Sequence, residues 1–385
     1  MKTIKNVIIF FQIIILICIS CITLSYYIMP DFYVNRVSSN LFSTEKILKT
    51  SENKLSTTKL KFLNIFDVKD ITLLNCNDSV VVCGTPMGID IYTKGLTVAG
   101  TNNINDNEKS PAKKAGIKIG DRIISVNGSK VETINQLRKV ITENQMTIRI
   151  KRDNKTFDTV LIPQYSKINK RYEIGLWVRD SSIGMGMISF YCKDINVSAC
   201  LGHAVVDVDT ADILDFTNGS IYTSQIYSVN KAKNGVVGQL YGKININEKI
   251  GDIIMNNQNG LYCTMDEALT GEEYIIANRQ EVELGKAQII TTLSNNKIEK
   301  YDIEIISVNL SSTDRNIKIK VTDDRLISQT GGIVQGMSGS PIIQNGKIVG
   351  VLNYALVDDP SKGYAVFAQT MFETAQQLYN SNFQR

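Results

Sequence analysis

The N-terminal part of the chain carries its longest apolar run. Lys2 and Lys5 precede residues 7–29, which are almost entirely apolar and long enough to cross a bilayer as a helix. Because no Ala-x-Ala cleavage site closes the run, we expect residues 1–30 to form an uncleaved transmembrane signal anchor rather than a removed signal peptide. The two lysines predict a cytoplasmic N terminus, which places the rest of the chain on the extracytoplasmic side.

A polar stretch follows the apolar run. We assign residues 31–79 to the segment before the first folded domain. Of these, residues 31 to about 70 are rich in Ser, Thr, Lys and Asn, and residues 62–66 form their only apolar cluster. This composition is typical of a flexible tether. Exposed polar segments are easily cut by proteases, so we expect cleavage here, by this chain or by a neighbour.

From residue 80 onward, short apolar runs alternate with polar residues and glycines, as in half-buried strands. Examples are residues 80–82, 89–91 and 96–98. The stretch 110–128 then contains, in order, a short helix pattern, a glycine stop, a Gly-Asp turn, a strand and an Asn-Gly hairpin. This order closely resembles a bacterial PDZ domain, which we expect over residues 80–165.

A PDZ domain binds an extended peptide as an added strand, and backbone N–H groups of one loop hold the C-terminal carboxylate of the peptide. The residues Lys94, Gly95, Leu96 and Thr97 stand where that loop is expected, since Gly95 permits the N–H groups to converge. We therefore predict that these four residues bind a peptide C terminus. The alternative is that Gly95 only makes a hairpin turn and the groove is closed.

The C-terminal half contains a candidate nucleophile. Residues 336–341 read Gly-Met-Ser-Gly-Ser-Pro, and two short strands joined by an Asn-Gly hairpin follow. A tight turn here lets the Ser338 hydroxyl project while the N–H groups of Gly336 and Ser338 form an oxyanion hole. The pattern resembles the nucleophile loop of chymotrypsin-like serine peptidases. A glycine-rich hairpin without chemistry is the alternative, and Ser340 is the competing nucleophile.

A serine hydroxyl needs a base, and histidine is the usual one near neutral pH. The chain contains a single histidine, His203, which follows Gly202 and precedes a strand-like run. A lone histidine is often only structural. Because the serine motif independently requires a base, we assign His203 as the general base.

Several motifs together resemble the stage IV sporulation protein B serine peptidases. They are Gly202-His203 and the stretches 207–210, 322–326 and 330–341. The resemblance extends from the anchor through the PDZ domain to about residue 367. It implies a mainly β chain with a chymotrypsin-like double β-barrel over residues 170–385.

The resemblance also implies a catalytic aspartate at Asp323, so that His203, Asp323 and Ser338 follow one another in chain order. Chymotrypsin-like enzymes usually take this aspartate from the other barrel. Asp207 and Asp209 therefore remain candidates for orienting the imidazole. The chain also departs from comparable family members, which tend to carry Thr-His where residues 353 and 354 are Asn and Tyr.

The function implied by the resemblance is that of a sporulation endopeptidase. Such an enzyme cleaves a membrane-associated regulatory protein, and itself, in the forespore intermembrane space and so triggers activation of a sigma factor. Two other functions fit a PDZ-containing chain: a non-catalytic adaptor, and an envelope quality-control protease. The latter usually places its PDZ domain after the catalytic domain.

Composition, charge and cysteine spacing narrow the possible functions further. The 385 residues suggest two folded domains plus extensions. Positive and negative charges are mixed and the net charge is +4, which gives no basic stripe for nucleic acid. The only CxxC spacing joins Cys18 and Cys21 within the apolar run, without a second pair to complete a metal site. We expect no metal and no cofactor, and the other cysteines to be small buried residues.

Overall fold

The computed structural model describes residues 9–17, 19–20, 23, 32–33, 42–44, 56–62, 66–73, 78–105, 108–153, 155–294 and 297–383. Residues 9–17 are helical. Much of the predicted anchor at residues 7–29 lies outside the described residues. Among those that are described, no helix combines the length and apolar character needed to cross a membrane.

The segment predicted as a tether contains strands. They are β1 (Phe32–Tyr33), β2 (Phe42–Thr44), β3 (Ser56–Phe62) and β4 (Phe66–Leu73), in the spatial order β1-β4-β3-β2. The longest pairing joins β3 and β4 in antiparallel register. Polar and apolar residues alternate within β3, a strand pattern that the overall polar composition of the segment hides.

Six antiparallel strands close into a first barrel. In order around the ring they are β5 (Ser79–Thr101), β12 (Leu176–Cys192), β13 (Val197–Cys200), β16 (Gly260–Met265), β15 (Gln239–Asn257) and β14 (Phe216–Asn230). Pairing of β14 with β5 completes the ring. The barrel therefore leaves no free edge among these strands.

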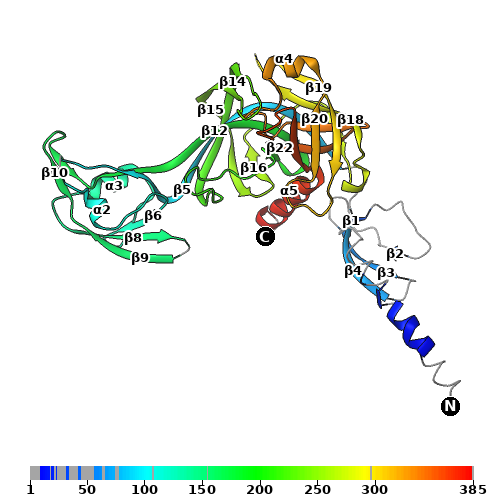
Figure 1. Ribbon diagram of the computed structural model, residues 1–385, viewed down its shortest axis with the longest axis horizontal. Helices are drawn as coiled ribbons and strands as arrows, with labels where there is room; N and C mark the ends of the chain where they lie inside the picture. Colours follow the sequence, from blue (N-terminus) through cyan, green and yellow to red (C-terminus); the bar gives the residue numbers. More distant parts are fainter. Residues whose placement is uncertain are drawn as a thin grey trace.

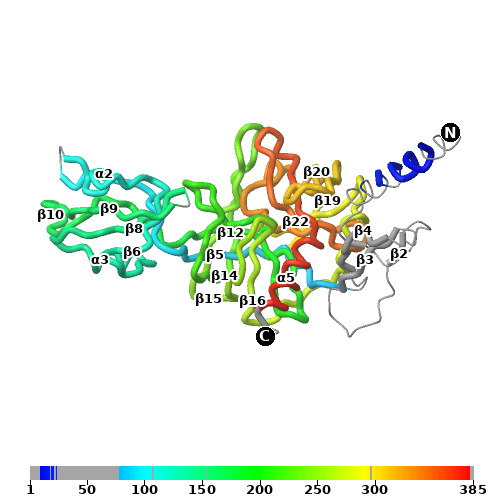
Figure 2. Tube along the Cα trace, turned by 90° about the horizontal axis from the view of Figure 1, so that it is seen from below, coloured from blue at the N-terminus to red at the C-terminus, as the bar shows by residue number. Residues whose placement is uncertain are grey.

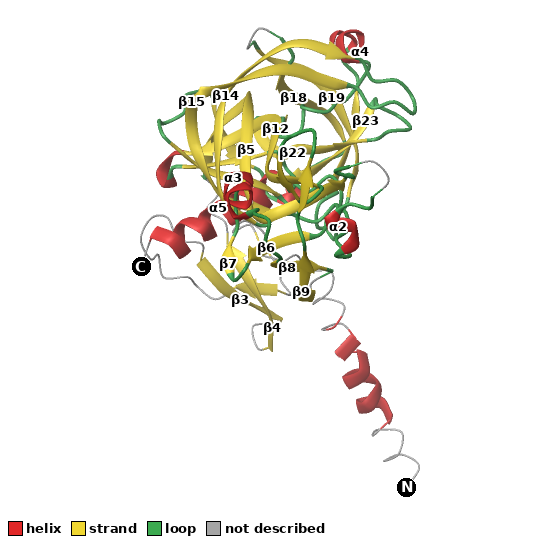
Figure 3. Ribbon diagram, turned by 90° about the vertical axis from the view of Figure 1, so that its left-hand side faces the viewer, coloured by secondary structure: helices red, strands yellow, loops and turns green. Residues whose placement is uncertain are grey.

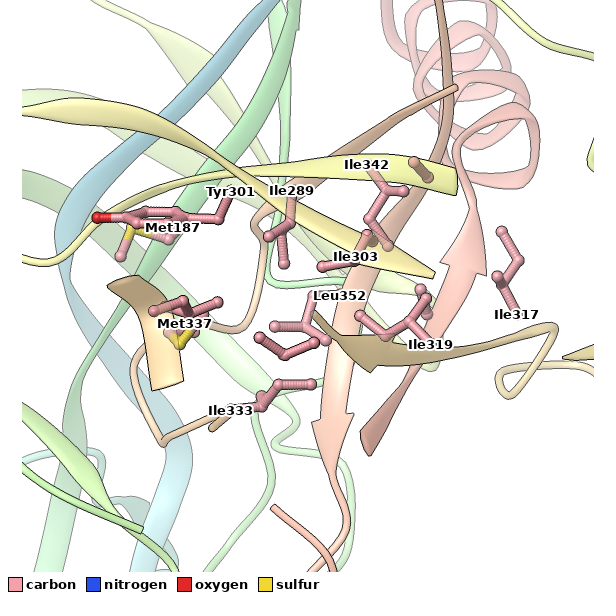
Figure 4. Packing of buried hydrophobic residues seen from close by; sticks show 14 of the residues in the cluster. Met187, Ile289, Tyr301, Ile303, Ile317, Ile319, Ile333, Met337, Ile342 and Leu352 are labelled. Carbon is pink, nitrogen blue, oxygen red and sulfur yellow. The ribbon is translucent and has the colours of Figure 1, made fainter. Parts of the chain in front are cut away.

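A second ring of six antiparallel strands follows. It consists of β18 (Gly285–Thr292), β19 (Ile298–Val308), β20 (Ile317–Val321), β23 (Lys362–Phe367), β22 (Lys347–Ala355) and β21 (Pro341–Gln344). Pairing of β21 with β18 closes it. Its interior is filled by aliphatic side chains, Tyr301 and two methionines (Figure 4). The predicted double barrel is thus present.

Three further elements join and cap the barrels. The strand β17 (Glu273–Ile276) pairs with β5 of the first barrel and β22 of the second. The C-terminal helix α5 (Ala368–Phe383) lies beside the barrels (Figure 1). Its apolar side packs into a core shared by both barrels. The short helix α4 (Asp324–Thr330) follows β20.

The PDZ domain forms a separate lobe (Figures 1 and 2). Its elements are α2 (Pro111–Lys114), β6 (Arg122–Val126), β7 (Ser129–Lys130), α3 (Ile134–Val140), β8 (Met146–Arg152), β9 (Lys155–Leu161), β10 (Gln164–Ser166) and β11 (Arg171–Glu173). They enclose a hydrophobic core of their own. Helices are few throughout the described chain, as Figure 3 shows.

The two longest strands belong to both lobes. The first part of β5 pairs in the barrel, where Tyr92 lies opposite Ser181, while its last part pairs in the PDZ domain, where Leu96 lies opposite Ile123. The strand β12 returns along the same path, with a register shift between Arg179 and Ser181. The PDZ domain is therefore inserted into a hairpin of the first barrel. Residues 80–93, which the sequence analysis grouped with the PDZ domain, pair within the barrel.

Candidate active site

The Ser338 loop lies between the two barrels. Gly339, with φ of 96°, leaves no room for a side chain, because an added Cβ would lie 2.2 Å from the Met187 carbonyl oxygen. The Met187 N–H donates to the Ser338 carbonyl at 2.9 Å, and the Gly339 N–H donates to the Leu352 carbonyl at 2.8 Å. Strands β12 and β22 thereby fix the loop from opposite barrels.

The two serines of this loop differ sharply in access. The Ser338 side chain is half-buried, and its Oγ donates to the Asn353 carbonyl at 3.2 Å. Ser340 is fully buried, with its Oγ 2.6 Å from the Met337 carbonyl and 2.9 Å from the Thr291 hydroxyl. A substrate therefore has access to Ser338 and not to Ser340.

The two N–H groups predicted to form the oxyanion hole are not used in hydrogen bonds within the described part of the protein. Within the described residues, no protein acceptor pairs with the N–H of Gly336 or Ser338. Their neighbours Met337 and Gly339 donate to Val334 and Leu352 instead. The positive φ of Gly336, 95°, contributes to this local path of the backbone. Both N–H groups remain available to an incoming oxyanion.

His203 lies against the same strand as Ser338. Its ring stacks on Tyr354 with centroids 5.4 Å apart and planes 24° from parallel. Its Nδ1 lies 2.8 Å from the Ala204 carbonyl oxygen. Because a carbonyl only accepts, Nδ1 carries the proton and Nε2 is left as an acceptor. No hydrogen bond links the imidazole to Ser338 in the described part of the chain, although both contact the 353–354 segment.

The surroundings of His203 favour its neutral form. Burial lowers the pKa of the imidazole below its ordinary value of 6.5, and the hydrogen bond to Ala204 offsets part of this effect. A base that stays neutral at mildly acidic pH remains able to accept a proton from a serine.

The candidate aspartates are all engaged elsewhere. Asp323 caps helix α4 and pairs with Arg325 at 2.8 Å, and this hydrogen bond lowers the pKa of Asp323 to about 2. Asp207 and Asp209 pair with Arg179. No hydrogen bond or ion pair of the described residues joins any of the three to His203. The Ala204 carbonyl is the group that contacts Nδ1.

The predicted carboxylate loop of the PDZ domain is not an open edge. Gly95, Leu96 and Thr97 are buried, and the backbone here pairs with β6 on one side and β12 on the other. The Lys94 N–H donates to the Asp215 carbonyl at 3.0 Å. The positive φ of Gly95, 87°, instead accommodates the passage of β5 from barrel to PDZ domain, with the Ile123 carbonyl 2.5 Å from where a Cβ would lie.

A different segment has the free edge that peptide addition needs. Residues 176–179 of β12 pair with β5 on one side only, among the residues the structure describes. Helix α3 lies next to this segment, because the Ile134 N–H donates to the Asp180 carboxylate at 2.8 Å. Gly175, with φ of 68°, leads into the strand. In the sequence, the Gly175-Leu176 pair marks the start of this free edge, but we did not predict a binding loop there.

The cysteines at 83, 192, 200 and 263 are free and buried, as predicted, while Cys18, Cys21 and Cys76 lie outside the described residues. Among described side chains, no three His, Cys, Asp or Glu residues gather in a way that could hold a metal ion.

The chain combines two antiparallel barrels, an accessible serine on a glycine-bounded loop between them, and a neutral histidine against the same strand. Together these features define a chymotrypsin-like serine peptidase. An inserted PDZ domain accompanies it. The SpoIVB peptidase S55 family matches residues 170–372, and the chain belongs to that family. Residues 107–152 match the PDZ domain family.

More distant similarities are partial. A zinc metalloprotease of Clostridium acetobutylicum is 29% identical over 110 residues, which make up 26% of this chain and 32% of that protein. A zinc metalloprotease of Rhizobium meliloti is 30% identical over 80 residues, or 20% of this chain and 21% of that protein. The chain thus spans about a third and about a fifth of these two relatives.

Solved structures with similar parts include the PDZ domain of the SdrC-like protein from Listeria monocytogenes. It has a TM-score of 0.20 and 18% identity, covering 23% of this chain and 90% of that one. The active form of the Rv3671c protease from M. tuberculosis has a TM-score of 0.33 and 14% identity, covering 50% of this chain and 72% of that one.

We expect Ser338 and His203 to act as one unit. Neither residue can catalyse the reaction without the other. Ser338→Ala and His203→Ala should therefore each lower kcat by roughly 10⁴-fold or more, and kcat of the double variant should be little lower still. Hydrolysis of a peptide substrate measures this, and additive losses would contradict it.

Ser340→Ala serves as the matched control. Its buried hydroxyl only supports the loop, so its loss should cost about 1–3 kcal/mol of stability while reaction with a fluorophosphonate probe persists. An inactive Ser340→Ala protein beside a reactive Ser338→Ala protein would move the nucleophile two residues along.

The low pKa of His203 predicts the acid limb of the pH profile. Since only neutral imidazole accepts the serine proton, the midpoint of kcat/KM should fall below the ordinary value of 6.5. Tyr354→Ala should expose the ring to water and raise this midpoint, whereas Tyr354→Phe should keep the stack and leave it unchanged. A wild-type midpoint above 6.5 would contradict the assignment.

Proposed function

We propose that this serine peptidase is a membrane-anchored sporulation endopeptidase. It cleaves a membrane-associated regulatory protein, and itself, in the space between the two membranes of the forespore. The observation that carries the peptidase part is the accessible Ser338 hydroxyl beside two unpaired backbone N–H groups. The sporulation role rests on family membership, and the anchor rests on the apolar run at residues 7–29.

The geometry supports the following sequence of steps. The Ser338 hydroxyl rotates away from the Asn353 carbonyl and attacks the scissile carbonyl carbon while its proton passes to Nε2 of His203. The N–H groups of Gly336 and Ser338 stabilise the negative oxygen. The imidazolium then protonates the leaving amine, and water hydrolyses the acyl-enzyme by the same route. No cofactor is needed.

The group that contacts Nδ1 of His203 is a backbone carbonyl and not a carboxylate. Hydrogen bonding to the Ala204 carbonyl fixes the tautomer that accepts from serine. Asp323, which the family resemblance implies as the third catalytic residue, would first have to leave Arg325. We therefore propose that Ala204 orients the imidazole in the conformation seen here.

The PDZ domain implies peptide binding, and we propose the free edge of β12 as the place. An extended peptide would add alongside residues 176–179, with helix α3 forming the opposite wall. Leu176 and Val178 pack against the PDZ core together with Ile134, so the edge is rigidly supported.

Two observations favour the alternative of a non-catalytic adaptor. His203 and Ser338 are not hydrogen-bonded to each other, and Asp323 is held by Arg325. Catalytic hydrogen bonds are often long or absent without substrate, and an adaptor would have no use for unpaired oxyanion donors. Failure of the wild-type protein to react with a fluorophosphonate would favour the adaptor.

Self-cleavage predicts a defined product. In sporulating cells, the released wild-type form should begin within residues 31–70, and the Ser338→Ala chain should remain uncut. N-terminal sequencing of the released form measures this, and mass spectrometry of membrane proteins lost only in the presence of wild type identifies the substrate. A start near residue 25 in both proteins would show that a signal peptidase made the cut.

The location of the peptide site generates a further test. Ile134→Lys should place a charge at the wall of the β12 edge and weaken binding of a C-terminal peptide by about tenfold or more, or about 1.4 kcal/mol. Ile168→Lys, at an exposed position outside the PDZ core, is the control. Hydrogen exchange should show peptide protection at residues 176–180, and protection confined to residues 94–97 would restore the original assignment.

A further inference from the structure

His203 has few side-chain restraints of its own. The imidazole makes one hydrogen bond to the next residue and one stack on Tyr354. Its place in the active site therefore depends on the backbone on either side of it. On the N-terminal side, Gly202 is pressed against β22, with the Leu352 carbonyl 3.1 Å from where a Cβ would lie. On the C-terminal side, a loop of residues 205–215 begins.

The base of the 205–215 loop is fixed to the first barrel. The Asn256 side chain accepts from the Val205 N–H at 2.8 Å and donates to the Val205 carbonyl at 2.9 Å. It also donates to the Leu214 carbonyl at 3.1 Å. An isolated bridge between Val206 and Ile213 closes the loop. The loop is thus a compact unit attached directly to the backbone of His203.

The tip of this loop is held by the PDZ end of β12. The Arg179 guanidinium hydrogen-bonds the Asp209 carboxylate and lies 3.7 Å from Asp207. Asp207 is only 7% exposed, and its carboxylate also accepts from the N–H groups of Asp209 and Thr210. This arrangement is more buried and more connected than an ordinary surface ion pair, which contributes little.

A second set of charges holds the end of the loop. Asp215 pairs with Lys94 at 3.0 Å and lies 3.9 Å from Arg122. Between the loop and the PDZ domain is a polar cavity of about 500 Å³, lined among others by Gly120 and Lys151. The loop therefore meets the PDZ domain mainly through charged contacts around a cavity, and not through a packed apolar interface.

We propose that Arg179 is a positioning residue for catalysis, which clamps the 205–215 loop and thereby holds His203 in reach of Ser338. The proposal rests on the proposed role of His203 as the general base. Arg179 is the last β12 residue paired with the PDZ part of β5 before the register shift. The Arg179 guanidinium therefore links the PDZ edge strand to the loop that follows the catalytic histidine, in addition to the contacts of Asp215 at the end of that loop.

The test uses the full chain and a short peptide substrate that does not need the PDZ domain. Arg179→Ala should lower kcat by about ten- to a hundredfold, because a small displacement of a catalytic group is costly, while KM stays within about twofold. Arg179→Lys should recover part of kcat. The charge exchange Arg179→Asp with Asp209→Arg should recover more than either single change does.

Arg149→Ala is the matched control. Arg149 makes a two-pronged ion pair with Asp158 at 2.9 and 3.0 Å, within the PDZ domain and away from the loop. The Arg149→Ala substitution should leave kcat and the pH profile unchanged. Arg179→Ala should also move the acid limb of kcat, since a displaced imidazole becomes more hydrated. A purely structural role for Arg179 would lower the melting temperature without this change.

The outcomes separate the two proposals. If wild type reacts with a fluorophosphonate at Ser338 and Arg179→Ala matches Arg149→Ala in kcat and pH profile, the clamp is wrong and the peptidase assignment stands. If wild type does not react, both are overturned. Should Arg179→Ala fail to fold, Asp209→Asn weakens the same contact, because it removes the nearer of the two carboxylate charges opposite Arg179 with little change of shape.

Discussion

The antiparallel pairing of β5 with β12 is the constraint on which the rest of the molecule depends. It runs from Val81 opposite Tyr191 in the barrel to Thr101 opposite Leu176 in the PDZ domain. A closed barrel needs every strand in place, and a PDZ domain needs a supported edge. One pair of strands meets both needs, so the two lobes are joined by a hydrogen-bonded ribbon and not by a flexible linker.

Both parts of the proposed active site lie close to this ribbon. The Met187 N–H of β12 holds the Ser338 carbonyl, and the barrel strand that pairs with β12 next leads directly into Gly202 and His203. The proposed catalytic groups thus come from loops whose ends are fixed by strands of different barrels. This is the usual way in which β-barrel enzymes combine a rigid scaffold with accessible chemistry.

The parts of the candidate site that could be proposed from the sequence are those that depend on local pattern or on elimination. The Ser338 loop is readable because glycines and a following hairpin are close in sequence, and His203 because the chain has one histidine. The insertion of the PDZ domain could not be predicted. Residues 80–101 look like separate short strands in the sequence but form one strand, and partners far along the chain decide which part of it belongs to each lobe. The hydrogen bond from His203 to a backbone carbonyl leaves no mark in sequence. The attachment of Asp323 to Arg325, two residues away, was visible only as adjacent charges.

The insertion also sets an order of events during folding. The two strands of the ribbon are separated in the chain by residues 102–175, a gap whose closure as a flexible loop carries an entropic cost. If the PDZ domain folds first, as an N-terminal unit commonly does during synthesis, it brings the end of β5 and the start of β12 together and removes that cost. The first barrel can then close from the ribbon outward. The PDZ domain is in this sense a folding template for the first barrel of the peptidase domain. A substitution that destabilises the PDZ core would therefore also impair folding of the peptidase domain.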